Sequence, residues 1–265
     1  MNVRTRLTAA VCLPLVLAAL SACDIVTADF KSQESAEWRK SYELQAGGTI
    51  EVHNVNGAIT VEPAAGNTVE VVAMKRARGA SPEAAREALE HIEIVESVSP
   101  SAIRLETRYP RNSPLFQGGG GGEVRYTLKV PTSAQARFKT VNGGIEVTDL
   151  AGSLNVQTTN GGITARGIGG PIDASTTNGG VDVELTRVSG EGVKLECTNG
   201  GIRLRLPSDA RATISASVTN GGIETGGLAL EASETSRRRL EGSLNGGGPN
   251  IRLRGTNGGI RLSSR

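Results

Sequence analysis

The sequence predicts an all-β protein built as a β-solenoid, a stack of similar coils. The prediction rests on a repeated Asn-Gly-Gly phrase, on alternating apolar residues around it, and on a composition with 35 Gly and 3% aromatic residues in 265. With the Asn as a marker, the phrase recurs in steps of 18, 18, 21, 21 and 37 residues. A fixed period of this length is typical of repeats that stack in one dimension. The markers are Asn142, Asn160, Asn178, Asn199, Asn220 and Asn257.

Each phrase is predicted to form a corner between two strands. Asn tolerates the left-handed backbone region, and Gly enters it without a Cβ clash. Apolar or small residues occupy every second position on both sides, as with Val156 and Thr158 before Asn160, and Ile163 and Ala165 after it. A period of two predicts strands. Coils of about 18–21 residues stacked in parallel place the marker residues in an Asn ladder at one corner.

Stacking in chain order also aligns charged residues of neighbouring coils. It places Arg203 between Asp182 and Glu224, and Arg205 beside Glu184. Opposite charges on neighbouring strands contribute only roughly 0.2–1 kcal/mol each, but they favour this register over a slipped one.

The sequence pattern changes along the chain and divides it into segments. Residues 138–265 are predicted to form the Asn-Gly-Gly solenoid, and residues 38–137 an N-terminal β region. In this region Asn56 and Gly57 make a first, imperfect corner, so the solenoid is expected to begin there before an insertion interrupts it. After Asn220 the repeat loosens, and the last edge is expected to be covered by residues 228–244 or left open to a partner strand.

The insertion contains one short helix and a flexible loop. Ser81 suits the N-cap and Pro82 the first helical position, which predicts a helix over residues 81–92. Two prolines and a run of five glycines predict a loop over residues 110–122. Leu115 and Phe116 in this loop have no evident core partner and are a possible partner contact.

The first 22 residues are predicted to be a lipoprotein signal peptide. Two arginines precede an apolar run that is too short to span a bilayer comfortably, and the run closes with Leu20, Ser21, Ala22 and Cys23. This ending resembles the bacterial lipobox, in which the Cys is acylated and begins the mature protein. The resemblance implies a lipid anchor on Cys23, followed by a polar tether that completes the segment 23–37.

The predicted anchor sets the expected location and partner. The mature chain is expected in a bacterial cell envelope, bound to a membrane through the lipid on Cys23. Asp24 resembles the signal that retains proteobacterial lipoproteins at the inner membrane. Without residues 1–22 the chain has 27 basic and 27 acidic residues, so its net charge is zero. A nucleic-acid-binding protein is expected to carry a basic surplus, so that class is set aside.

The number and positions of the cysteines argue against disulfide or cysteine-based metal chemistry in the mature chain. Cys12 leaves with the signal peptide and Cys23 is expected to be lipidated, so Cys197 remains alone. A single Cys forms no internal disulfide and no cysteine-based metal cluster. Cys197 occupies an inward position of its strand and is predicted to be a small buried residue.

The whole pattern resembles a known bacterial family. A lipobox, a mixed β region with one helix, and iterated TVNGGI, TTNGGI and TNGGI corners that close with LNGGGPNIRLRGTNGGIRL are similar to the β-strand-repeat family of proposed adhesins. That family is a domain of unknown function and looks like autotransporter-adhesin head domains. The resemblance covers about residues 45–265 and implies a β-solenoid in the envelope, with no catalytic residues to carry over.

The residues themselves predict no enzyme, no cofactor, no metal site and no small-molecule substrate. The sequence lacks HExxH, GxSxG, a phosphate loop and clustered CxxC pairs. One enzyme alternative is a polysaccharide-cleaving β-helix that uses a carboxylate and arginine face as acid and base. The residues of that face are Asp182, Glu184, Arg203 and Arg205.

Two non-enzymatic alternatives complete the set. Thr159, Thr177, Thr198, Thr219 and Thr256 precede the marker Asn and could form a hydroxyl column like that of ice-binding solenoids. A regulatory or stress-sensing envelope component would use the 110–122 loop to meet a membrane partner. The preferred hypothesis is an envelope lipoprotein whose rigid solenoid is an adhesin-like interaction or scaffold surface for an envelope protein or glycan.

Overall fold

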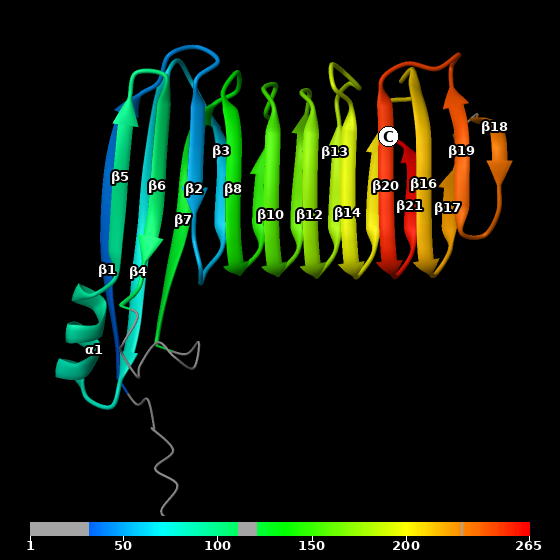
Figure 1. Cartoon of the computed structure of the whole chain (residues 1–265). Helices are drawn as coiled ribbons and strands as arrows, with labels where there is room; N and C mark the ends of the chain where they lie inside the picture. Colours follow the sequence, from blue (N-terminus) through cyan, green and yellow to red (C-terminus); the bar gives the residue numbers. More distant parts are fainter. Residues whose placement is uncertain (1–31, 111–120, 229) are drawn as a thin grey trace, which may run out of the picture.

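The computed structural model describes residues 32–110, 121–228 and 230–265. These residues form two long β-sheets that lie face to face, with one helix at one end (Figure 1). The ten-stranded sheet runs, in spatial order, β1 (Ser32–Glu43), β4 (Thr68–Gly79), β7 (Gly122–Pro131), β3 (Ile59–Ala64), β9 (Ile145–Thr148), β11 (Ile163–Ile168), β13 (Val181–Leu185), β15 (Ile202–Leu206), β21 (Ile260–Ser264) and β17 (Ile223–Gly226).

The second sheet has eleven strands. Its spatial order is β18 (Leu230–Thr235), β19 (Arg239–Leu244), β16 (Ala212–Asn220), β20 (Asn250–Asn257), β14 (Val193–Asn199), β12 (Ile172–Asn178), β10 (Leu154–Asn160), β8 (Gln135–Asn142), β2 (Thr49–His53), β6 (Ala102–Arg108) and β5 (Glu93–Ser99).

Seven coils make up the body of the stack, which confirms the predicted β-solenoid. Each coil has one strand in each sheet, joined by an Asn-Gly corner, and neighbouring coils pair in parallel with like residues opposite each other. Val156 of β10 pairs with Ala174 of β12, and Ala174 pairs with Leu195 of β14. The coils in spatial order are β2/β3, β8/β9, β10/β11, β12/β13, β14/β15, β20/β21 and β16/β17.

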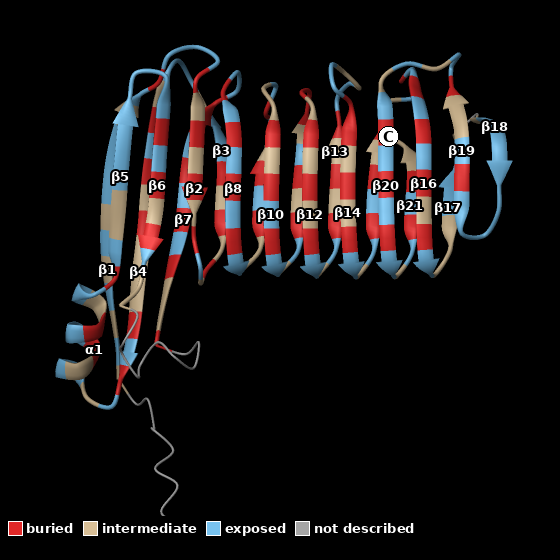
Figure 2. Ribbon diagram, in the orientation of Figure 1, coloured by how far each residue is buried: buried red, intermediate tan, exposed pale blue. Residues whose placement is uncertain are grey.

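Buried and exposed residues alternate along most strands, and the buried ones form the core between the two sheets. In β12 the residues Ile172, Ala174 and Thr176 are buried, while those between them are partly exposed. The same stripe repeats from coil to coil (Figure 2). Because most of the inward side chains are aliphatic or small, the two sheets pack closely, and each buried Val, Leu or Ile contributes about 1.5–3 kcal/mol.

The N-terminal β region extends the same two sheets. In the ten-stranded sheet β7 pairs parallel with β3, and β4 and β1 follow it as antiparallel strands. In the eleven-stranded sheet β6 pairs parallel with β2, and β5 follows it antiparallel. Buried residues of this region and of the repeats belong to one hydrophobic cluster. The change at residue 138 is therefore a change of sequence pattern within one continuous core.

The predicted tether is wrong over its second part. Residues Ser32–Glu37 lie in β1, which pairs along its whole length with β4. Strand β4 thus gives the polar segment a partner, and an edge strand tolerates polar and charged residues on its exposed side. Residues 23–31 lie outside the described residues.

The one helix confirms the expected element in the N-terminal insertion. Helix α1 spans Pro82–Glu90, and the hydroxyl of Ser81 accepts a hydrogen bond from the backbone N–H of Ala84 at 3.2 Å. Ala85 and Ala88 are buried where α1 packs on β4 and β1. No helix among the described residues is long and apolar enough to cross a membrane.

Coils are not stacked in chain order at the C-terminal end, which corrects one expectation. The last coil in sequence, β20/β21, inserts between β14/β15 and β16/β17. Consequently Arg203 lies beside Asp182 and Arg261, and the neighbour of Glu224 is Arg261 at 2.7 Å. Arg205 pairs with Glu184 as expected.

The reason for this order is the chain segment that follows β17 and forms β18 and β19, which we call the excursion. Strand β19 returns antiparallel along the outer edge of β16, and β18 pairs with β19 beyond it. With that edge occupied, the last coil takes the inner edge of β16 and the free edge of β14. The excursion thus covers the end of the eleven-stranded sheet, while β17 is the last described strand of the other.

A disulfide test distinguishes this order from stacking in chain order. Lys194→Cys combined with Arg252→Cys is expected to cross-link under mild oxidation, because paired residues on adjacent strands lie about 4.8 Å apart. Lys194→Cys with Ser215→Cys is expected not to cross-link, since two strand spacings exceed the roughly 7 Å limit. Mass spectrometry of linked peptides reads the result, and the reverse pattern would mean that coils follow chain order.

Candidate functional site

The Asn-Gly corners line up along one edge of the stack, the lower edge in Figure 1. We call this the corner row and define it by the Asn of each coil and the glycine that follows it. In spatial order its Asn residues are Asn56, Asn142, Asn160, Asn178, Asn199, Asn257 and Asn220. Six of them are the predicted marker residues, and the seventh, Asn56, belongs to the imperfect corner.

The side chains of the corner row form one continuous amide ladder. Each Nδ2 donates to the Oδ1 of the preceding coil in the stack, as from Asn178 to Asn160 at 2.8 Å and from Asn257 to Asn199 at 2.8 Å. The remaining steps have the same direction and lengths of 2.8–2.9 Å. Because every amide points the same way, the exposed edge is ordered before any partner arrives.

Backbone hydrogen bonds run along the same row in the opposite direction. The N–H of Gly161 donates to the carbonyl of Asn178 at 2.8 Å, and the N–H of Gly179 to that of Asn199 at 2.9 Å. Such close stacking requires glycine. A Cβ on Gly161 would overlap the carbonyl oxygen of Gly143, and Gly179 also has φ of 148°.

A column of buried polar side chains supports the corners from inside. The Thr158 hydroxyl donates to the carbonyl of Gly143 at 2.9 Å, and that of Thr176 to the carbonyl of Gly161 at 2.8 Å. An unpaired buried carbonyl costs about 1–3 kcal/mol, so these hydroxyls stabilise the turn. In the described part of the chain, four of the five buried polar side chains belong to this column, namely Asn54, Thr140, Thr158 and Thr176, and the fifth, Thr107, bonds the Tyr126 hydroxyl at 2.7 Å.

Cys197 occupies the next place in the column. It pairs with Thr176 in register, and its Sγ lies 3.0 Å from the carbonyl of Gly179. Burial raises the pKa of the thiol, so it stays protonated and donates weakly to that carbonyl.

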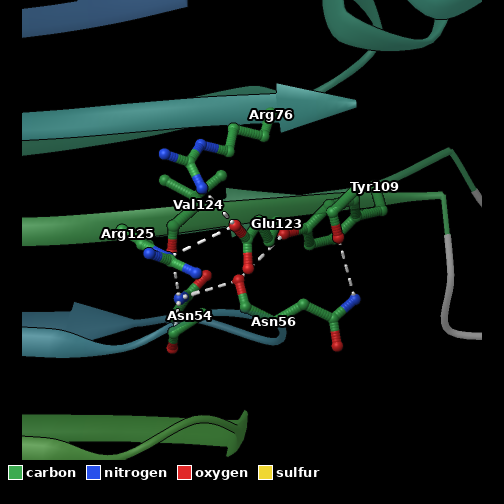
Figure 3. A network of polar contacts seen from close by, with 9 residues as sticks. Asn54, Asn56, Arg76, Tyr109, Glu123, Val124 and Arg125 are labelled. Atoms are coloured by element: carbon green, nitrogen blue, oxygen red, sulfur yellow. Dashed lines mark hydrogen bonds and ion pairs between the residues drawn. The ribbon is translucent and has the colours of Figure 1, made fainter. Parts of the chain in front are cut away.

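The corner row begins in a polar network that the sequence analysis did not identify (Figure 3). Asn54 donates from Nδ2 to the carbonyls of Asn56, Gly57 and Val124 at 3.2, 3.1 and 2.8 Å. The Tyr109 hydroxyl donates to the carbonyl of Asn56 at 3.4 Å. The only sequence signal is that Asn54 stands where four of the other coils have Thr or Cys before the corner.

An open cavity of about 250 Å³ lies beside this network. Arg76 and Arg125 flank the carboxylate of Glu123 at 3.4 and 3.2 Å, which neutralises part of the local charge. Burial raises the pKa of Tyr109 far above its usual value, so its hydroxyl remains a donor. The lining is Gln33, Asn56, Gly57, Arg76, Arg78, Gly122, Glu123 and Asn142.

Three of the four residues of the enzyme alternative are held in ion pairs. Arg205 contacts Asp182 at 3.0 Å and Glu184 at 3.9 Å, and Arg265 contacts Glu184 at 3.3 Å. Arg203 lies next to Asp182 in register but is separated from Glu224 by the inserted coil. This arrangement is that of an ion-pair ladder on a sheet face.

The two histidines lie apart from any reactive arrangement. His53 contacts Glu51 at 2.7 Å on the surface, and His91 ends α1. Within residues 32–110, 121–228 and 230–265, no group of His, Cys, Asp and Glu is arranged to hold a metal ion. Cys23, Leu115 and Phe116 lie outside the described residues.

The threonines that precede the corner residues form one exposed column beside the amide ladder. Their stacking in register follows from the pairing of the residues on either side. The exposed members are Thr159, Thr177, Thr198, Thr256 and Thr219. Together with the Asn side chains they make the corner row a narrow, polar and regular surface.

Comparison with protein families identifies a match over most of the chain. The family model described as Toastrack DUF4097 matches residues 48–263. No curated protein matches the chain.

Similar solved structures come from several bacteria. A proposed cell adhesion protein from Clostridium sporogenes is 12% identical, with 88% of this chain and 100% of that chain covered and a TM-score of 0.49. A proposed adhesin from Bacteroides fragilis is 12% identical, with 87% and 97% covered and a TM-score of 0.28. A proposed lipid binding protein from Parabacteroides distasonis is 11% identical, with 89% and 98% covered and a TM-score of 0.32.

Two neighbouring glycines test the close stacking of the corners. Gly161→Ala is expected to lower the free energy of unfolding by about 3 kcal/mol, because its Cβ would overlap the backbone of the preceding coil at Gly143. Gly162→Ala is the matched control, since its Cβ would lie 3.5 Å from the carbonyl oxygen of Gly180, and it is expected to change stability by less than about 1 kcal/mol. Urea unfolding measures both, and equal effects would contradict the stacking.

Chemical ageing tests the backbone ladder. In Asn-Gly sequences the glycine nitrogen attacks the Asn side-chain carbon, ammonia leaves, and the succinimide hydrolyses to Asp or isoaspartate. The glycine N–H donates to the next coil after each corner Asn except Asn220, because Gly221 lies in the last coil and its N–H has no partner in the described structure. Asn220 is therefore expected to deamidate fastest in the corner row.

Peptide mapping after incubation at mildly alkaline pH measures this difference. Asn178 in the same sample is the internal control, because the N–H of Gly179 is engaged. Similar rates at Asn178 and Asn220 would show that the backbone ladder does not protect the row.

Proposed function

The chain belongs to the Toastrack family DUF4097, and from this membership and the corner row we propose a non-enzymatic envelope lipoprotein whose solenoid presents an adhesin-like interaction or scaffold surface. The observation that carries the proposal is the ordered amide ladder. Its side chains and backbone are already hydrogen-bonded, so a partner would lose little conformational entropy on binding. A protein or a glycan with regularly spaced polar groups suits such a surface.

Among the described residues, the lack of an assembled reaction centre supports a binding role. The carboxylates of Asp182 and Glu184 face arginines within ion-pair distance, and they lie on the outer face of a sheet rather than in a cleft. An aromatic platform for a sugar ring is also missing from the repeats, since the chain after Phe138 contains no Phe, Tyr or Trp.

The lipid anchor is the sequence-based part of the proposal. Cys23 follows the lipobox-like residues, and β1 begins at Ser32. The connection over residues 24–31 has a maximum reach of roughly 26–29 Å at 3.3–3.6 Å per residue. An anchor on Cys23 would therefore hold the start of β1 close to the membrane surface.

A second candidate function is regulation through the loop near this anchor. Its flanking residue Gly121 accepts a hydrogen bond from the N–H of Arg78 at 3.0 Å, and Arg78 pairs with Gln33 at the start of β1. The described end of the 110–122 loop at Gly121 therefore lies beside β1, the strand that follows Cys23 in the sequence. In this alternative the partner of Leu115 and Phe116 is a membrane component.

Site-specific photo-crosslinking tests the interaction surface in intact envelopes. A crosslinker at Thr177 in the corner row is expected to capture a defined protein or glycan, and one at Glu191 is the control, because Glu191 is exposed in the loop at the opposite end of the strands. A crosslinker at Phe116 reports on the regulatory alternative. Capture at Phe116 with none at Thr177 would favour regulation, and no capture at either would refute both roles.

Two further measurements address the anchor and the absence of catalysis. Cys23→Ser is expected to move the protein from the membrane pellet to the soluble fraction. Retention in the pellet would refute the lipid anchor. Turnover on a panel of glycans that disappears in Asp182→Asn would replace the binding role with catalysis.

A further inference from the structure

The C-terminal cap of the stack forms a second polar cleft, separate from the start of the corner row. It lies where the turn between β18 and β19 crosses the corner ends of β16 and β20, and its volume is about 470 Å³. Three arginines, four hydroxyl residues and one carboxylate contribute to its lining. The arginines are Arg238, Arg239 and Arg254.

Strand register places a gap between two of these arginines. Ser217 of β16 pairs with Arg254 of β20 on one side and with Arg239 of β19 on the other. Two strand spacings separate the arginine Cα atoms by roughly 10 Å, and the small Ser217 side chain leaves the space between them open. Long guanidinium side chains on both sides can converge on a group seated above Ser217.

The third arginine comes from the turn, which is tied to the corner. The N–H of Val218 donates to the carbonyl of Arg238 at 2.9 Å, and the N–H of Ile223 to that of Arg237 at 3.0 Å. These bonds hold Arg238 over the cleft. Hydroxyls of Ser236, Thr219 and Thr256 lie around it.

Positive charge in the cleft is only partly neutralised. Glu234 contacts Arg239 at 3.9 Å. Across the described residues, Arg238 and Arg254 have no carboxylate within ion-pair distance, and Glu196, the strand neighbour of Arg254, contacts Lys194 at 3.8 Å instead. By contrast, Arg261 on the other sheet is fully engaged by Glu224 at 2.7 Å. Two unpaired guanidinium groups therefore face one cleft.

We propose that this cleft binds a phosphate monoester. Such a group carries about −1.5 to −2 charges at neutral pH and three acceptor oxygens, which match two unpaired arginines and the surrounding hydroxyls. The planar guanidinium forks of Arg254 and Arg238 bind phosphate oxygens in pairs, and Ser217 supplies a hydroxyl donor beneath them. The cleft shares Thr219 and Thr256 with the end of the exposed threonine column, but its arginines lie outside the corner row, so the site stands whether or not that row has a partner.

The phosphate could be carried by a sugar or by a lipid headgroup, and the chemistry of recognition is shared. Glucose 1-phosphate represents the first source, with glucose as its uncharged control. Vesicles of phosphatidylcholine with phosphatidic acid represent the second, with pure phosphatidylcholine as the control. The vesicle arm uses the full chain with Cys23→Ser, so that the predicted lipid anchor does not itself insert.

Calorimetric titration of the full chain in neutral detergent, together with vesicle sedimentation, tests the proposal. Saturable binding of at least one phosphate monoester is expected, with none to its control. Arg254→Gln and Arg238→Gln are each expected to weaken that binding at least tenfold, because charge-assisted hydrogen bonds are lost. Arg252→Gln is the matched control, since Arg252 lies on the same face of β20 but outside the cleft, and it is expected to change affinity less than twofold.

Each remaining outcome has a definite meaning. Binding of glucose 1-phosphate, of phosphatidic acid vesicles or of both supports the site and assigns its source. No saturable binding in either arm overturns the proposal. Equal losses in Arg252→Gln and Arg254→Gln also overturn it, because they indicate diffuse charge attraction. If Arg254→Gln fails to fold by circular dichroism, Arg254→Lys replaces it, and its affinity is expected to fall at least threefold because a Lys cannot form the bidentate contact.

Discussion

Close contact between the glycine backbones of successive corners is the constraint on which the rest of the structure depends. Without a side chain at Gly161, the carbonyl of Gly143 can approach it, and the two coils reach the spacing of a parallel sheet. At that spacing the Gly161 N–H meets the Asn178 carbonyl, and the Asn178 amide meets that of Asn160. One contact thus sets the backbone ladder and the side-chain ladder together.

The same contact explains the pattern of polar residues inside the core. Turning the chain at the first corner glycine points its carbonyl inward, away from the parallel ladder, and in several coils an inward side-chain donor satisfies it. Thr158 and Thr176 supply a hydroxyl, and Cys197 supplies a weaker donor. The outer surface is ordered for the same reason, which makes a rigid edge available for recognition at low entropic cost.

Much of the coil could be predicted from the sequence, because strand alternation and corner chemistry are local. The position of each strand within a coil follows from the period-two pattern around Asn160 and its equivalents. The polar network at the start of the row could not be predicted, since Asn54 and Val124 are far apart in sequence and meet only because β7 lies beside β3. The strand at Ser32–Glu37 escaped prediction because its polar sequence forms a strand only when β4 lies next to it.

The sequence by itself determined the repeating unit, its corner and its two strands, because these depend on residues within about one coil. Only the tertiary structure decided which coil lies on which. Every coil offers the same Asn, Gly and aliphatic columns, so local pairing energies barely distinguish one neighbour from another. The order is decided when β19 covers the outer edge of β16 and leaves its inner edge to β20, which also brings Arg254 beside Ser217 and Arg239.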